Sequence, residues 1–134
     1  MKVFVHGVPD TNEMWNELVS ALGLAVYEYE TLSLPGFGCA VPNGFNSTML
    51  CYSNWLIKEL ESISGKHGGP IDLVGHDWGA ILANRAASLR PDLIKSLVFG
   101  GAAIDSKYRE IRKDVDANIQ RVDAQVKMAR DNGC

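Results

Sequence analysis

The organisation of this chain follows from residues 74–80, Val74-Gly75-His76-Asp77-Trp78-Gly79-Ala80. An apolar run enters this stretch and a helix-compatible run leaves it. A strand that turns into a helix within three residues needs small residues on both sides of the turn, because backbone segments approach closely there. Gly75 and Gly79 meet that need. The pattern therefore predicts a strand, a tight turn and a helix, with Asp77 in a strained conformation at the apex.

Two interpretations of Asp77 are open at this point. The spacing Gly-x-Asp-x-Gly matches the nucleophile elbow G-x-S-x-G, with aspartate in place of serine. A carboxylate is already ionised at neutral pH, so it can attack carbon without a base to activate it. Alternatively, Asp77 only caps the following helix, since a carboxylate at a helix amino end accepts hydrogen bonds from free N–H groups.

Composition limits the class of protein. The chain has 134 residues, 46% of them hydrophobic, which is enough for one domain with a buried core. The formal net charge of −3 provides no basic surface for nucleic acid. No apolar run approaches the length that crosses a bilayer, and the start of the chain does not resemble a signal peptide. The three cysteines have no metal-ligand spacing, so we expect reduced thiols, a cytoplasmic location, and neither metal nor cofactor.

Four short segments rich in β-branched residues are predicted to be strands. They are residues 2–6, the later half of 24–34, 71–74 and 94–99. Strands that alternate with helices at this spacing form a parallel sheet with right-handed crossovers. We therefore predict an α/β core over residues 1–104, with about four strands in the order 2-1-3-4 and helices on both faces.

Three helices are predicted between these strands. The first has an apolar stripe of Met14, Trp15, Leu18 and Leu22, and Asp10 with Glu13 resembles a capping box before it. The second begins after Thr48 and is expected to break between residues 65 and 70. The apolar face of this second helix consists of Met49, Tyr52, Leu56, Leu60 and Ile63. The third follows the turn at Asp77 and ends near residue 90.

Residues 105–134 are predicted to form a separate amphipathic helix. Apolar residues recur there at helical spacing, between charges of both signs. In a sheet of order 2-1-3-4 the fourth strand is an unpaired edge, and part of one sheet face is bare. An exposed sheet edge or apolar sheet face is usually covered by another part of the chain, or else it associates with another molecule. We therefore expect a homodimer formed through the open sheet edge and this helix.

The order of the strands also locates the site. In open α/β sheets, ligands bind beyond the carboxyl ends of the strands, where the strand order reverses. Here the reversal falls between the first and third strands. The loops that follow them, His6-Gly7-Val8-Pro9 and Gly75-His76-Asp77-Trp78, should face one another.

Taken together, these motifs resemble the first part of an α/β-hydrolase. The resemblance rests on Val5-His6-Gly7-Val8-Pro9, Leu32-Ser33-Leu34-Pro35-Gly36-Phe37-Gly38 and the residues around Asp77, with Asp92-Leu93-Ile94-Lys95-Ser96-Leu97-Val98 after them. The motifs occur in the family's order over residues 1 to about 105. The motif Gly-His-Asp-Trp-Gly is similar to the elbow of epoxide hydrolases and haloalkane dehalogenases. In those enzymes a carboxylate attacks an electrophilic carbon and forms an ester.

The resemblance implies roles for individual residues. Asp77 would be the nucleophile, and the backbone N–H groups of Val8 and Trp78 would form an oxyanion hole. The indole N–H of Trp78 could also point at a leaving halide. His6, His76 and Phe37 would contact a small apolar electrophile. Without the resemblance, the two histidines are better interpreted as residues that structure their loops. Asp105 falls where some relatives place the acid of the triad, or else it caps the tail helix. The tail itself, residues 105–134, would be the start of the family's lid region or a dimerisation helix.

Three departures from the family pattern bear on activity. Val8 stands where many haloalkane dehalogenases have an asparagine that holds halide, which favours epoxide chemistry. Ser33 replaces the family's strand-end aspartate. The family's catalytic histidine follows its last strand, and none of the three histidines here is expected to replace it. A truncated relative that folds and self-associates without turnover is therefore the alternative. A flavodoxin-like binding module is less favoured, because a Gly-rich loop that cradles phosphate is lacking.

Overall fold

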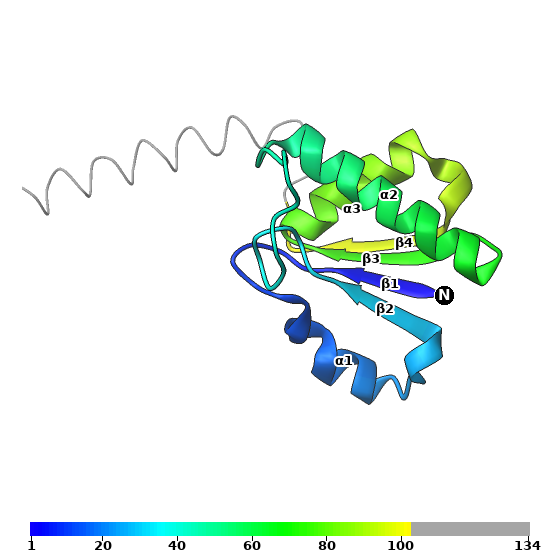
Figure 1. Ribbon diagram of the computed structural model, residues 1–134. Coiled ribbons are helices and arrows are strands. Elements are labelled where there is room, and N and C mark those ends of the chain that lie inside the picture. The colour runs from blue at the N-terminus through cyan, green and yellow to red at the C-terminus, as the bar shows by residue number, and fades with distance from the viewer. Residues whose placement is uncertain (103–134) are drawn as a thin grey trace, which may run out of the picture. The chain divides into compact units, whose positions relative to one another are not determined.

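The computed structural model describes residues 1–102, so Asp105 and the helix predicted over residues 105–134 lie outside the described residues. Strands and helices alternate along the described part (Figure 1). The strands are β1 Lys2–Val5, β2 Tyr29–Leu32, β3 Ile71–His76 and β4 Ile94–Gly100. The α-helices are α1 Asn16–Ala21, α2 Met49–His67 and α3 Trp78–Leu89. Short 3-10 helices span Asn12–Trp15, Val26–Glu28 and Pro91–Leu93.

The four strands form one parallel sheet in the order β2-β1-β3-β4. This order confirms the prediction from the alternation of strands and helices. The strand order reverses between β1 and β3, which pair directly from Lys2 opposite Asp72 to Val5 opposite Gly75. The carboxyl ends of β1 and β3 therefore lie side by side, as a ligand site at a strand-order reversal requires.

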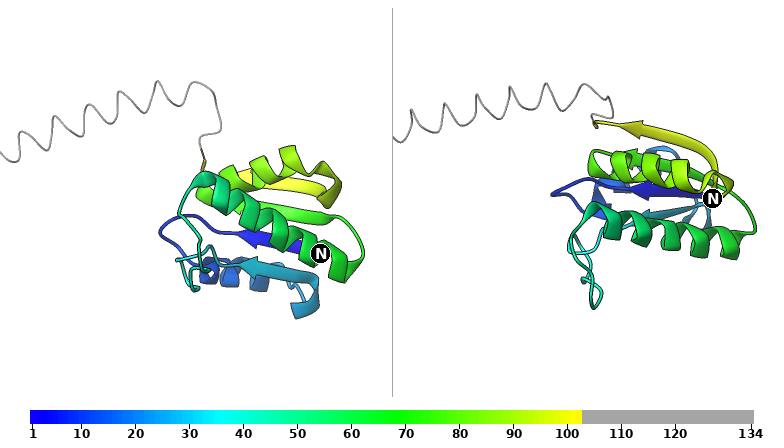
Figure 2. Two further views of the ribbon diagram at one scale, coloured as in Figure 1. Left: turned by 45° about the horizontal axis from the view of Figure 1, so that its top comes forward. Right: turned by 90° about the horizontal axis from the view of Figure 1, so that it is seen from above.

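Helices lie on both faces of the sheet, with α1 on one face and α2 and α3 on the other (Figures 1 and 2). Side chains alternate between these faces along each strand. The larger core, between the sheet and α2 with α3, includes Val3, Val5, Ile71, Leu73, Leu56, Leu60 and Leu82. A smaller cluster under α1 consists of Phe4, Trp15 and Val19. The two layers cover both faces of β1 and β3.

The first helical segment differs in detail from the prediction. Its first turn is a 3-10 helix, and the N-cap is Thr11 rather than Asp10. The Thr11 hydroxyl accepts a hydrogen bond from the Glu13 N–H, which lies within reach because a 3-10 turn is tight. Only part of the predicted apolar stripe is buried, since Leu18 is 40% exposed and Leu22 is 55% exposed.

The second helix is longer than expected. It begins after Thr48, whose hydroxyl accepts from the Cys51 N–H at 3.3 Å, and continues through Gly65 to His67. The predicted break at Gly65 is wrong, because a single exposed glycine lowers helix stability by only about 1 kcal/mol. Gly68, with φ of 73°, ends the helix instead. Within residues 1–102, no helix combines the length and apolar character that crossing a bilayer requires.

A groove lies beside α1 on the face opposite α2 and α3. Its volume is about 360 Å³. It is lined by Lys2, Phe4, Leu18, Leu22, Asp72, Val74, Ser96 and Val98. Within the described residues β4 pairs only with β3, and Val98 on β4 is 60% exposed. The predicted open edge and partly bare sheet face are therefore present in this part of the chain.

Candidate active site

The turn between β3 and α3 has the backbone of a strained elbow. Asp77 has φ of 52° and ψ of −119°, and it is the one non-glycine residue with positive φ among the described residues. Residues with a Cβ rarely adopt this conformation, which costs on the order of 1–3 kcal/mol and is found mainly at functional sites. The conformation that the sequence predicted for the apex is thus observed.

The glycines around Asp77 are required by close backbone contacts. A Cβ on Gly79 would lie 2.2 Å from the Val5 carbonyl oxygen, and one on Gly75 would lie 2.6 Å from the Gly79 carbonyl oxygen. On the facing loop, a Cβ on Gly7 would lie 2.6 Å from Oδ2 of Asp77. These glycines allow α3 to start against β1 and allow the two loops to meet.

The Asp77 carboxylate points to the facing loop and not into the helix. Its Oδ2 accepts a hydrogen bond from the Val8 N–H at 3.2 Å. The first turn of α3 bonds instead to the Asp77 backbone carbonyl, which accepts from Ala80 and Ile81. The Asp77 side chain makes no capping hydrogen bond. The geometry therefore disagrees with the capping interpretation.

His6 lies behind the site and not at its surface. The imidazole is fully buried. Its Nε2 accepts from the Leu34 N–H at 2.9 Å, so Nδ1 carries the proton and donates to the Gly7 carbonyl at 2.7 Å. The prediction of a substrate contact for His6 does not fit this position. The alternative, a histidine that structures its loop, does fit, because His6 ties the Gly7–Val8 loop to the segment after β2.

His76 is also turned away from the facing loops. It is the last residue of β3 and shares the α1 side of the sheet with Asp72 and Val74. Its Nε2 lies against Gly101, where a Cβ would be only 2.7 Å away. Its Nδ1 is buried and has no hydrogen-bond partner among the described residues. Strand alternation therefore separates His76 from the pocket, although the two loops are adjacent in space.

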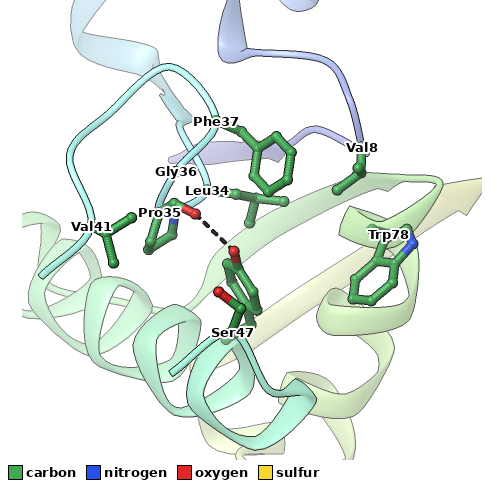
Figure 3. Close-up of a pocket in the computed structure, with 9 residues that line it drawn as sticks. Val8, Leu34, Pro35, Gly36, Phe37, Val41, Ser47 and Trp78 are labelled. Atoms are coloured by element: carbon green, nitrogen blue, oxygen red, sulfur yellow. Dashed lines mark hydrogen bonds between the residues drawn. The ribbon is translucent and has the colours of Figure 1, made fainter. Parts of the chain in front are cut away.

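A pocket of about 370 Å³ opens between the two loops, the segment after β2 and the start of α2 (Figure 3). It is lined by Val8, Leu34, Pro35, Gly36, Phe37, Val41, Ser47, Tyr52 and Trp78. The predicted residues Val8, Trp78 and Phe37 are all part of this lining. Asp77 is half-buried and is not itself a lining residue, but it bonds to Val8 and directly precedes Trp78, and both of these residues line the pocket.

Several lining residues were not predicted from the sequence. Its helical spacing predicts a core position for Tyr52, which its 6% exposure confirms, but Tyr52 also lines the pocket. Leu34, Pro35 and Gly36 belong to the motif quoted for the resemblance, which could have indicated them. Val41 and Ser47 lie in an irregular segment and carry no recognisable signal.

The site combines a carboxylate with apolar walls and with backbone donors. The Val8 N–H already contacts Asp77, and Trp78 is the first residue of α3, where N–H groups have no intrahelical partner. The helix amino end favours negative charge at this point. No group of three or more His, Cys, Asp or Glu side chains that could hold a metal ion occurs in residues 1–102.

The ion pairs of Arg90 lie away from the site. Arg90, at the end of α3, bonds to Asp92 and Glu61. The hydrogen bonds to Asp92 and then Glu61 raise the pKa of the arginine, and those from Arg90 lower the pKa of the Asp92 carboxyl. Glu61 and Asp92 are exposed to solvent and Arg90 is partly exposed, so this cluster adds little to stability.

Comparison with known proteins agrees with this geometry. An epoxide hydrolase of Caballeronia sordidicola is 37% identical over 100 residues, which cover 73% of this chain and 29% of that protein. An (E)-2-((N-methylformamido)methylene)succinate hydrolase of Acinetobacter baylyi is 27% identical over 122 residues, which cover 91% of this chain and 43% of that protein. The chain thus spans less than half the length of these relatives.

Solved structures show the same similarity. An epoxide hydrolase from Vigna radiata superposes with a TM-score of 0.59 at 29% identity, covering 72% of this chain and 32% of that one. A haloalkane dehalogenase from Bradyrhizobium elkani superposes with a TM-score of 0.60 at 25% identity, covering 75% and 33%. The model of the "Alpha/beta hydrolase family" matches residues 3–131. By its elbow, its sheet and this match, the chain belongs to the alpha/beta hydrolase family.

Proposed function

We propose that Asp77 is the nucleophile of a hydrolase that acts on epoxides or alkyl halides. The observation that carries this proposal is the Asp77 carboxylate, held at a strained apex and bonded to Val8 instead of capping α3. In the proposed step, a carboxylate oxygen forms a bond to the electrophilic carbon. The C–O bond of the epoxide breaks and its oxygen takes a proton from water, or the carbon–halogen bond breaks and halide leaves. The product is an alkyl ester on Asp77.

The backbone N–H groups of Val8 and Trp78 are proposed to form the oxyanion hole for the second step. When water attacks the ester carbonyl, negative charge develops on the oxygen of Asp77 that did not bond to the substrate. Donors placed in advance stabilise this charge without reorganisation, and removing one such donor costs about 3–4 kcal/mol in known enzymes. The hydrogen bond from Val8 to Oδ2 supports this role, since that donor already points at the carboxyl group.

The substrate is proposed to be a small apolar electrophile, with epoxides favoured over halides. Apolar side chains from Val8, Phe37 and Val41 line the pocket. Val8 has no side-chain donor for a halide, and the Caballeronia sordidicola relative is an epoxide hydrolase. Trp78 is 40% exposed at the pocket and supplies the one indole N–H of its lining. Halide displacement would depend on that group.

The proposal is tested by covalent labelling. The chain is incubated with small epoxides and bromoalkanes, and its intact mass is measured. We expect one added alkyl group, located by peptide mapping on Asp77, and Asp77→Asn should abolish it. Asp72→Asn is the matched control, because Asp72 is on β3, the strand that leads into Asp77, but lines the groove on the opposite face. Labelling of Asp77 no greater than that of surface carboxylates would favour a non-catalytic relative or a binding module.

We also propose that the chain forms a homodimer through the edge of β4. Val98 and Phe99 are 60% and 48% exposed, and open strand edges favour association. Light scattering should give twice the mass of the chain at micromolar concentration. Val98→Lys should shift the chain to monomer, because a lysine on an edge strand opposes pairing, whereas Lys95→Gln on the same strand should not. A monomeric wild-type chain would contradict this proposal.

A further inference from the structure

Tyr52 connects the larger core to the pocket. It extends from the first turns of α2, and its side chain is buried. Its ring packs edge-on against Phe45, with ring centroids 4.9 Å apart and an interplanar angle of 80°. Its hydroxyl donates a hydrogen bond to the Pro35 carbonyl at 2.8 Å, drawn as the dashed line in Figure 3. One buried side chain therefore joins a long helix to the pocket wall.

That wall is a compact turn over residues 34–39. Within it, the Phe37 N–H donates to the Leu34 carbonyl at 2.8 Å and the Gly36 N–H to the Cys39 carbonyl at 3.1 Å. Gly36 and Gly38 have φ of 86° and 85°, which residues with a Cβ rarely adopt. These features give the turn its shape. They do not fix where it lies relative to the rest of the domain.

Two hydrogen bonds attach the turn to other elements among the described residues. The Leu34 N–H donates to His6 at the start of the turn, and Tyr52 bonds to Pro35 at its centre. The bond to His6 lies next to the end of β2, which the sheet already fixes. The bond from Tyr52 reaches the centre of the turn, next to Phe37, which packs against the larger core and faces Val8 and Trp78 in the pocket (Figure 3).

We propose that Tyr52 is a positioning residue that sets the width of the pocket between Phe37 and Trp78, and so selects substrates by width. The hydroxyl proton of Tyr52 is already donated to Pro35, so the residue acts through the wall and not on the reacting atoms. The kinetic consequence rests on the proposed nucleophile Asp77. The structural consequence, a fixed wall, does not.

Tyr52→Phe tests the inference, because it removes the hydroxyl and keeps the ring against Phe45. Amide hydrogen exchange of Gly36 and Phe37 should become about 3–10-fold faster, as expected for a wall that has lost one hydrogen bond. Labelling of Asp77 is then measured over a range of concentrations of propylene oxide and of styrene oxide. The half-saturating concentration of propylene oxide should rise about 3–10-fold relative to that of styrene oxide, with maximal rates unchanged. Tyr27→Phe is the control, since Tyr27 is 79% exposed and lies in the 3-10 helix before β2, at the other end of that strand from the wall.

The two arms separate the two ideas. Unchanged exchange at Gly36 and Phe37 would overturn the positioning role, whether or not Asp77 is labelled. Faster exchange with unchanged selectivity between the two epoxides would overturn the role in specificity. Absence of labelling in the wild-type chain would count against Asp77 as nucleophile, and the exchange arm would still decide the role of Tyr52.

Discussion

Replacing Gly79 with alanine is expected to destabilise the domain by roughly 3 kcal/mol or more, because forced overpacking costs about 1–3 kcal/mol even where side chains can adjust. Here the added Cβ would meet backbone, at 2.2 Å from the Val5 carbonyl and 2.6 Å from that of His6. The Val5 oxygen belongs to β1, which pairs with a strand on each side, and the His6 oxygen follows directly after β1. Urea unfolding followed by circular dichroism measures the change.

Gly65→Ala is the matched control for this substitution. Gly65 lies within α2, and a Cβ there would meet nothing within 4 Å. Alanine at an exposed helix position is more stable than glycine by about 0.5–1 kcal/mol, so this variant should unfold at a higher urea concentration. An equal unfolding midpoint for Gly79→Ala and the wild type would mean that α3 does not start in contact with β1.

The sheet was predictable because its signals are local. The β-branched segments, the glycines around Asp77 and the helical runs each specify an element, and right-handed crossovers leave few ways to order them. The errors also have local causes. The sequence pattern predicts a helix break at Gly65, although an exposed glycine is tolerated there and Gly68 provides the left-handed cap. The pattern also predicts a cap at Asp10, although the 3-10 turn brings Thr11 to that position.

The site was predictable only in part, because it depends on where side chains point. The contact of Asp77 with the Val8 loop followed from the strand order. His6 and His76 stand next to Gly7 and Asp77 in the sequence, but neither lines the pocket. His6 is buried behind the site and bonded to Leu34, and strand alternation turns His76 to the opposite face of the sheet. Tyr52 has the helical spacing of a core residue, and its bond to Pro35 joins segments 17 residues apart. A pattern of residue types does not contain that information.

The surroundings of the histidines determine how far the proposed reaction can proceed in this chain. Both nitrogens of His6 are bonded inside the protein. His76 packs against Gly101 on the α1 side, and His67 is at the end of α2, 3.9 Å from Glu30. None of the three lines the pocket beside Asp77. Within residues 1–102, then, no imidazole is placed to activate water for hydrolysis of an ester on Asp77.

The ester on Asp77 is therefore expected to persist in the 134-residue chain. Its formation needs only an ionised carboxylate aligned with the substrate, whereas its hydrolysis needs a general base, which typically contributes about 10²–10⁴-fold. One equivalent of epoxide should be consumed per chain, with no diol released beyond that amount. Time-resolved intact mass measures the adduct, and chromatography of the medium measures the diol. After excess reagent is removed, the adduct should decay with a half-life of hours or longer, because uncatalysed ester hydrolysis is slow. Release of many equivalents of diol would show that a base is present. His76→Gln would then be the first variant to measure, because His76 directly precedes Asp77 and its Nδ1 has no hydrogen-bond partner within residues 1–102.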